Sequence, residues 1–113
     1  MARSRDVPPA SQSHAARQPR ELLEEAEGLR QQGKLDRAEA IIYPLVRRHP
    51  GYVAALHTLG LVYLDKRDFE RALDCLVRAS MLDPANWMTL TALSLAYLRL
   101  GASEMAAHRL HGA

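Results

Sequence analysis

One spacing recurs along this chain and limits what it can fold into. Similar residues return at intervals of 34 positions, as seen at Pro50 and Pro84, at Ala38, Ala72 and Ala106, and at Leu29, Tyr63 and Tyr97. A fixed period of this length is typical of architectures that stack one supersecondary unit on the next. The period divides residues 19–113 into three units, 19–52, 53–86 and 87–113, and we expect the last to be incomplete.

The pattern within residues 53–86 predicts a helical hairpin. Apolar or small residues three and four positions apart mark one face of each of two helices, first Leu56, Leu59, Gly60 and Tyr63, then Ala72, Leu76 and Ala79. Between them, Lys66-Arg67-Asp68 is a polar turn that is long enough only to join antiparallel helices. Pro84 ends the second helix, because proline restricts the residue before it and cannot continue the helix.

Applying this register to the whole period predicts an all-α domain over residues 19–113. The expected helices cover residues 19–32, 35–48, 53–66, 69–82, 87–100 and 103–111. Gly101 is expected to end the fifth helix as a left-handed cap. Pro44 lies inside the second helix, where a proline costs about 3 kcal/mol and kinks or breaks an ordinary helix.

The central unit resembles the tetratricopeptide repeat (TPR) in Leu56-x2-Leu59-Gly60-x2-Tyr63, Ala72-x3-Leu76 and Pro84. Leu56 and Leu76 stand where the family often has tryptophan and phenylalanine, and both replacements are apolar. The resemblance implies a right-handed α-solenoid of three TPR hairpins. In such proteins the first helices of successive hairpins line a concave groove that takes a peptide or a helix from a partner protein.

Carried over by register, the resemblance places the peptide-binding groove at Ala54, His57, Thr58, Leu61, Leu64, Asp65, Met88, Thr91, Leu95, Leu98 and Arg99. The four leucines of this set are not needed for the stripes within each hairpin, and exposed apolar patches commonly mark interaction sites. They could also pack within the solenoid. One subfamily clamps a partner's terminal carboxylate with basic residues and asparagines, but Thr58 and Ala92 occupy the matching positions, so no clamp is expected.

The favoured interpretation is a protein interaction module or scaffold, in which His57, Asp65 and Arg99 set the polarity of the groove. The partner is expected to be a protein, and no catalysis is expected. The resemblance leaves two alternatives: a substrate-selecting TPR fragment of a larger enzyme such as a glycosyltransferase, or a small TPR chaperone of type III secretion type. A third hypothesis is self-association through the open C-terminal end near residues 108–113.

Charge and composition argue against nucleic-acid-binding and membrane-spanning proteins. The net charge of +2 comes from residues 1–18, whereas residues 19–113 hold 12 basic and 12 acidic residues, so nucleic-acid binding is not expected. Arg47-Arg48-His49 is a short basic cluster at a helix C-terminus, where cations interact favourably with the helix dipole. No apolar run approaches the roughly 18 residues of a membrane span. We therefore expect a soluble, cytoplasmic protein.

No residue pattern supports a cofactor or a metal site. Cys75 is the only cysteine, which excludes an internal disulfide and a thiolate metal cage. His108 and His111 could share a helix face, yet a metal site needs three or four ligands.

The N-terminal part of the chain departs from the repeat pattern, both before the first unit and at Glu25 within it. Residues 1–18 contain Pro8-Pro9 and few large apolar side chains, so we expect a disordered leader. A targeting role or a partner-binding segment remains open for it. Glu25 stands where Leu59 and Leu93 stand in the other units, which predicts a polar end cap that meets water.

Overall fold

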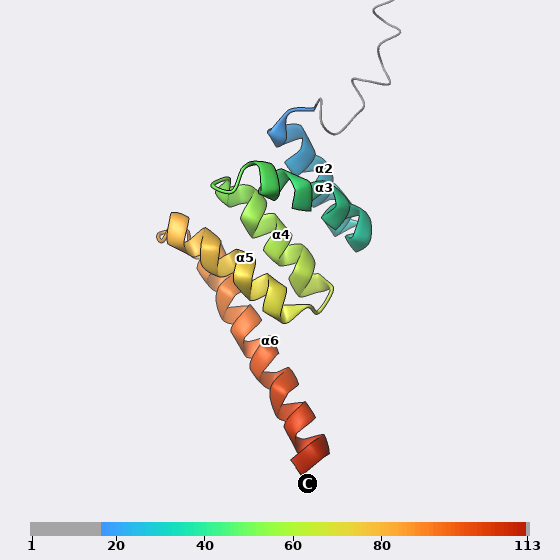
Figure 1. Cartoon of the computed structure of the whole chain (residues 1–113), viewed down its shortest axis with the longest axis vertical. Coiled ribbons are helices and arrows are strands. Elements are labelled where there is room, and N and C mark those ends of the chain that lie inside the picture. The colour runs from blue at the N-terminus through green and yellow to red at the C-terminus, as the bar shows by residue number, and fades with distance from the viewer. Residues whose placement is uncertain (1–16, 113) are drawn as a thin grey trace, which may run out of the picture.

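The structure is a computed structural model that describes the backbone of residues 17–112 and the side chains of residues 17–107. Every element in this part of the chain is a helix: α2 (Pro19–Gln31), α3 (Leu35–Arg48), α4 (Val53–Asp65), α5 (Phe69–Leu82) and α6 (Trp87–Gly112) (Figure 1). The predicted all-α class is confirmed. The predicted disordered leader lies almost entirely outside the described residues.

Two antiparallel hairpins, α2 with α3 and α4 with α5, are closed by turns of the same design. In the first turn the backbone N–H of Lys34 donates to the carbonyl of Leu29, and in the second Asp68 donates to Tyr63, both at 2.9 Å. The central residue has a positive φ in both turns, +79° at Gly33 and +66° at Arg67. These bonds satisfy carbonyls that a helix end leaves open. The 34-residue period therefore repeats a backbone conformation as well as a residue pattern.

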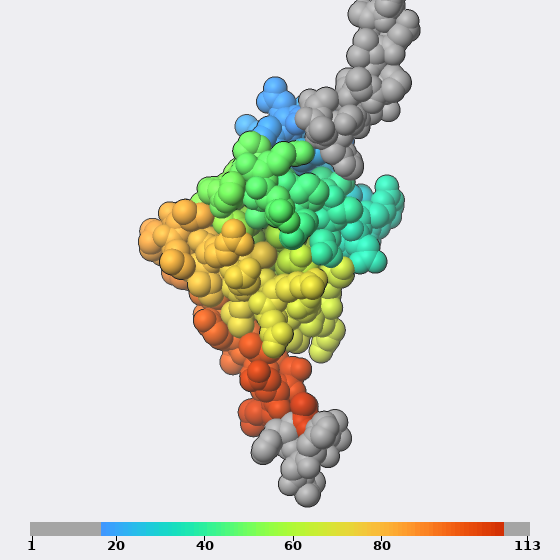
Figure 2. Space-filling view, in the orientation of Figure 1, coloured from blue at the N-terminus to red at the C-terminus, as the bar shows by residue number. Residues whose placement is uncertain are grey.

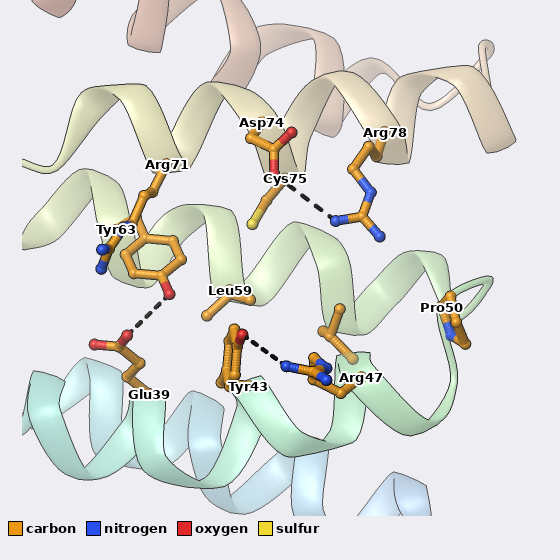
Figure 3. Close-up of a pocket in the computed structure, with 11 residues that line it drawn as sticks. Glu39, Tyr43, Arg47, Pro50, Leu59, Tyr63, Arg71, Asp74, Cys75 and Arg78 are labelled. Carbon is orange, nitrogen blue, oxygen red and sulfur yellow. Dashed lines mark hydrogen bonds and ion pairs between the residues drawn. The ribbon is translucent and has the colours of Figure 1, made fainter.

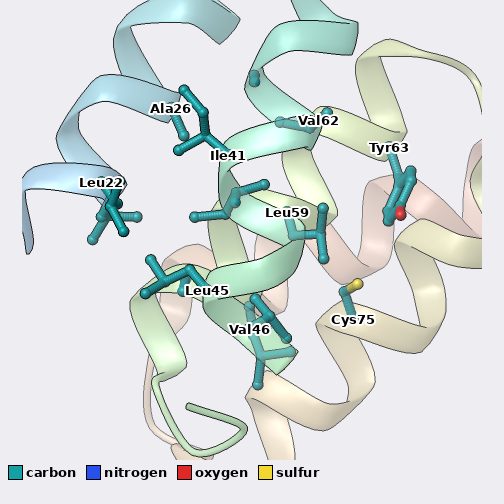
Figure 4. Close-up of a cluster of buried hydrophobic side chains, with 14 of the residues drawn as sticks. Leu22, Ala26, Ile41, Leu45, Val46, Leu59, Val62, Tyr63 and Cys75 are labelled. Atoms are coloured by element: carbon teal, nitrogen blue, oxygen red, sulfur yellow. The ribbon is translucent and has the colours of Figure 1, made fainter. Parts of the chain in front are cut away.

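The hairpins are held together by one apolar cluster that runs through α2, α3, α4 and α5 (Figure 4). It contains the predicted stripes, which are buried in both hairpins: Leu22, Ala26, Leu29, Ala38, Ile42, Leu56, Leu59, Tyr63, Ala72 and Ala79. Gly60 permits the closest approach, because a Cβ atom there would lie 2.7 Å from the Cγ atom of Leu76. Successive hairpins pack one on the next, as expected for an α-solenoid.

The third hairpin was predicted wrongly. Instead of two helices over 87–100 and 103–111, α6 runs without a break from Trp87 to Gly112. Gly101 occupies the position of Gly33 and Arg67, but its neighbours differ. Asp68 accepts a hydrogen bond from the N–H of Arg71 and so caps α5, whereas Ala102, at the matching position, has no side chain that can do so. Lys34 does not cap α3 either, but there the turn residue before it is Gly33 with a φ of +79°. One glycine in a helix costs only about 1 kcal/mol, so the helix continues.

The straight course of α6 leaves apolar side chains uncovered. α6 packs chiefly on α5, through a small cluster of Leu76, Ala92 and Ala96. Leu90 and Tyr97 are 42% and 56% exposed, whereas Leu56 and Tyr63, at the matching positions of α4, are 0% and 4% exposed. Figure 2 shows α6 leaving the body that α2 to α5 form.

Pro44 does not break its helix, so the predicted break was wrong, whereas a kink at Pro44 stays a prediction. α3 is continuous from Leu35 to Arg48, with Pro44 inside it. Pro44 and Ala40 are both exposed, so water can satisfy the Ala40 carbonyl that lacks an N–H partner. The first hairpin accommodates the proline because the missing bond faces solvent.

Glu25 also departs from the expectation that it meets water alone. Its carboxylate oxygen Oε1 pairs with Nη1 of Arg17 at 2.5 Å, and both side chains are largely covered.

Among the helices of residues 17–112, none combines the length and apolarity needed to cross a membrane.

Candidate binding groove

The first helices α2, α4 and α6 are connected by a series of polar contacts. The hydroxyl of Thr58 donates to Oε2 of Glu27 at 3.2 Å, and Nη1 of Arg30 donates to Oδ2 of Asp65 at 2.9 Å. Further along, Nδ1 of His57 lies 3.2 Å from Oγ1 of Thr89. We call these three pairs the polar belt. The belt fixes the spacing of the helices that were predicted to line a groove.

The belt uses three residues that the sequence assigned to ligand contact, His57, Thr58 and Asp65. Thr58 is 1% exposed, so it cannot lie on the surface that a partner would touch, and its predicted place in the groove lining is corrected. His57 is half-buried. Thr89, fully buried, was missed by the sequence analysis. The structure places Thr89 as the counterpart of Ala55, 34 positions earlier and also fully buried, but the predicted stripe did not include Ala55, so no sequence signal marked Thr89.

The surroundings of His57 favour its neutral form. Burial is the main cause that lowers the pKa of His57, and the nearby positive charge of Arg30 lowers it further. Glu27 acts in the opposite direction but does not reverse the shift. The imidazole is therefore a neutral hydrogen-bonding group in the belt near pH 7.

A cavity of about 290 Å³ opens where the end of α4 meets the middle of α6. Its walls comprise Leu61, Leu64, Asp65, Arg67, Phe69, Leu95 and Arg99. We call this the α4–α6 cavity. Five of these residues are in the predicted groove. Arg67 and Phe69 were not among the predicted groove residues. Arg67 was expected in the turn of the hairpin, and Phe69 at the start of its second helix.

The predicted groove residues differ in how far a ligand could reach them. Leu61 and Leu64 are half-buried and pack against the cluster that includes Ala92 and Ala96, so the possibility that they pack within the solenoid holds in part. The others lie on the surface: Ala54, Asp65, Met88, Thr91, Leu95, Leu98 and Arg99 are exposed. Leu98 is the most open of the large apolar members, at 71%. The accessible apolar surface is thus concentrated on α6.

Charged groups border this apolar surface on one side. Asp65 is held by Arg30 from α2, so its carboxylate is already neutralised within the chain. The guanidinium of Arg67 lies 5.8 Å from the ring centroid of Phe69, in a cation–π contact at the rim of the cavity. Arg99 lies on the cavity wall from the side of α6. The rim therefore offers positive charge next to exposed leucines.

No metal chemistry is indicated in this part of the chain. Among the described residues, no three histidine, cysteine, aspartate or glutamate side chains are placed together so that they could hold a metal ion. The side chains of His108 and His111, the pair noted in the sequence, lie outside the described residues.

The central hairpin is the part of the chain that matches a known protein family. Residues 53–86 match the family model of the tetratricopeptide repeat. The match covers α4, the turn and α5, which are the elements with packed neighbours on both sides. A search of curated proteins found no match to the chain.

Proposed function

We propose that this chain, whose residues 53–86 match the tetratricopeptide repeat, holds an apolar segment of a partner protein in the α4–α6 cavity. Tetratricopeptide repeats generally serve protein–protein interaction and are not catalytic. The observation that carries the proposal is that exposed Leu95 lines this cavity, while Leu98, three positions further along α6, is 71% exposed.

The dimensions and charge of the cavity define the partner segment. A volume of about 290 Å³ is at the lower end of ligand sites, so one large apolar side chain fills it. Leu98 then offers further apolar contact next to it. Arg67 and Arg99 at the rim favour an acidic residue adjacent to the apolar anchor. We therefore propose a short helix or extended peptide with a leucine or aromatic anchor beside an aspartate or glutamate.

The test uses the full chain as bait in lysate and compares three proteins. Leu95→Glu with Leu98→Glu places carboxylates on the proposed surface, and both positions are exposed, so the fold should survive. Met105→Glu is the matched control, because Met105 is an exposed apolar residue of α6 outside the cavity. We expect the double variant to lose partners that the wild type and the control both retain.

Circular dichroism of each variant verifies that the helices are intact. If the folded double variant captures the same proteins as the wild type, the α4–α6 cavity is not the binding site.

Self-association is a second candidate, because Leu90 and Tyr97 are exposed at positions whose counterparts in α4 are buried. The expectation that residues 108–113 take part concerns side chains outside the described residues. Sedimentation velocity over a hundredfold range of concentration tests this candidate, with Tyr97→Glu as the variant expected to abolish any dimer. A monomer at every concentration excludes it. No observation favours the enzyme-fragment or secretion-chaperone alternatives, and these and the cytoplasmic location stay predictions.

A further inference from the structure

A larger cavity, of about 540 Å³, lies between the second helices of the two hairpins, α3 and α5 (Figure 3). We call it the α3–α5 cavity. Its walls are formed by Glu39, Tyr43, Val46, Arg47, Pro50, Leu59, Tyr63, Arg71, Asp74, Cys75 and Arg78. None of these residues lines the α4–α6 cavity.

The two cavities lie on different sides of α4. Leu59 and Tyr63 reach the α3–α5 cavity, whereas Leu61 and Leu64 reach the α4–α6 cavity. Residues two positions apart on an α-helix point about 200° apart, since each residue turns the helix by about 100°. A ligand of the α3–α5 cavity would therefore leave the groove proposed above free.

Two rows of side chains face each other across the α3–α5 cavity. Glu39, Tyr43 and Arg47 follow one another at every fourth position along α3. Arg71, Cys75 and Arg78 form the opposite row on α5 (Figure 3). The spacing of three and four places each row on one helix face. Leu59, Val46 and Cys75 give the cavity an apolar floor, on which the Cys75 thiol stays protonated because burial raises its pKa to about 12.

The end of the cavity at Glu39 is already satisfied by neighbouring groups. Glu39 accepts a hydrogen bond from the Tyr63 hydroxyl at 2.9 Å and one from Nζ of Lys66 at 2.6 Å. Burial acts to raise the pKa of Glu39, but the bonds from Lys66 and Tyr63 outweigh it and keep the pKa lowered. Arg71 lies 5.9 Å from the centroid of the Tyr63 ring. At this end of the cavity, Glu39 and Arg71 thus already have partners within the chain.

The opposite end carries positive charge that is weakly matched. Arg47 and Arg78 extend from opposite walls, on the same side of the cavity as Pro50 (Figure 3). Nη1 of Arg47 donates to the hydroxyl of Tyr43 at 3.2 Å, a neutral acceptor. Nη1 of Arg78 lies 3.8 Å from Asp74, and both of these side chains are substantially exposed. An exposed ion pair such as that of Arg78 contributes little, and Arg47 is held only by a neutral hydroxyl and by a cation–π contact 5.8 Å from the Tyr43 ring centroid. Both guanidinium groups can therefore turn to a ligand.

We propose that the α3–α5 cavity binds a carboxylate carried on an apolar or aromatic group. The carboxylate lies between Arg47 and Arg78, because guanidinium groups bind carboxylates with two parallel hydrogen bonds. The apolar group covers Leu59, Val46 and Cys75. A doubly charged phosphate fits less well, since Asp74 next to Arg78 repels a second negative charge.

The first experiment asks whether the carboxylate is recognised. The full-length chain is titrated with 3-phenylpropionate and with its neutral amide, while backbone amide signals are followed by NMR. We expect the acid to bind about tenfold more tightly, which is the usual value of a charge-assisted hydrogen bond. The largest shifts should fall on Arg47, Leu59, Cys75 and Arg78. Equal affinity for acid and amide overturns the proposal, as does tighter binding of benzyl phosphate.

The second experiment identifies the source of the carboxylate. The dipeptide acetyl-Phe-Glu-amide carries it on a side chain, and acetyl-Phe-Gln-amide is its neutral control. Binding of this dipeptide and of 3-phenylpropionate, each above its control, indicates a carboxylate side chain of a partner protein. Binding of 3-phenylpropionate alone indicates a free small acid.

The third experiment assigns the arginines. Arg47→Gln with Arg78→Gln should weaken the acid about tenfold and leave the amide unchanged. Arg48→Gln is the matched control, because Arg48 is exposed, adjacent in sequence and absent from the cavity wall. An equal loss with Arg48→Gln would reduce the effect to net charge and overturn the assignment.

Discussion

Gly28 and Gly33 lie five positions apart and have opposite backbone requirements. Gly28 is inside α2 and Gly33 has a φ of +79°, and a Cβ atom added at either one meets no atom within 4 Å. Gly28→Ala should therefore raise the free energy of unfolding by about 0.5–1 kcal/mol, through the higher helix propensity of alanine. Gly33→Ala should lower it by about 1 kcal/mol, because alanine is strained at positive φ. Urea unfolding of the two variants measures both effects, and shifts of the same sign would contradict this account.

His57 predicts a specific dependence of stability on pH. Its pKa is lowered in the folded protein, so folding disfavours its protonation. The stabilisation is fully present above the ordinary pKa near 6.5 and is lost as pH falls through the lowered value.

The measurement compares wild type with His57→Gln, which can still form a hydrogen bond to Thr89. Between pH 7.5 and pH 5.5 the urea midpoint of the wild type should fall, while that of the variant should fall less. The carboxylates of Asp36 and Glu39, whose pKa values are lowered, are protonated only at still lower pH, so they do not mask the effect. Parallel curves over this range would show that His57 is not the titrating group.

At the scale of helices, α3 tolerates Pro44 at a measurable cost in stability. The helix is continuous, and the carbonyl of Ala40 lacks the N–H that any other residue at position 44 would supply. Pro44→Ala should raise the free energy of unfolding by about 1–3 kcal/mol, by restoring this bond and removing ring crowding. Pro50→Ala, outside the helix, is the control and should change stability by less than about 0.5 kcal/mol. No gain for Pro44→Ala would mean that the proline costs α3 nothing once water binds the Ala40 carbonyl, and would contradict this prediction.

The first two hairpins could be predicted from the sequence, whereas the continuous helix α6 could not. The stripes and turns of the first two hairpins follow from local pattern, since Leu56, Tyr63 and their partners recur at fixed spacings and are buried as predicted. Gly101 keeps that spacing, yet α6 does not turn there. The period alone could not reveal this, because the course of the helix depends on small local preferences at Gly101 and Ala102. Local terms of about 1 kcal/mol are below what a residue pattern resolves.

For the molecule as a whole, the sequence predicted which helices line the candidate site but not which of their side chains are accessible. The register brings Leu61, Leu64 and Leu95 to one cavity, because α4 and α6 are equivalent helices of successive units. It could not show that Thr58 turns toward Glu27, since that choice depends on the distance between packed hairpins. The α3–α5 cavity was also missed. Its walls combine side chains from three helices, and no single helix carries the pattern.

The distribution of the core predicts an order of opening along the chain. One large cluster unites α2, α3, α4 and α5, whereas a small cluster of Leu76, Ala92 and Ala96 attaches α6. Repeat proteins are stabilised mainly by contacts between neighbouring units, so α6 should open before the rest. In native-state hydrogen exchange we expect the slowest amides in α4 and α5, with exchange from Tyr97 to Ala107 faster by at least about tenfold.

Leu56→Ala distinguishes opening of α6 from global unfolding. Leu56 is fully buried in the large cluster, so this substitution should lower the free energy of unfolding by about 2–5 kcal/mol. The exchange of α4 and α5 amides, which requires opening of that cluster, should accelerate accordingly. Amides between Tyr97 and Ala107 should hardly change, because they already exchange by opening α6 alone. If they accelerate as much as those in α4, the chain unfolds as one cooperative unit and the two clusters are not energetically separate.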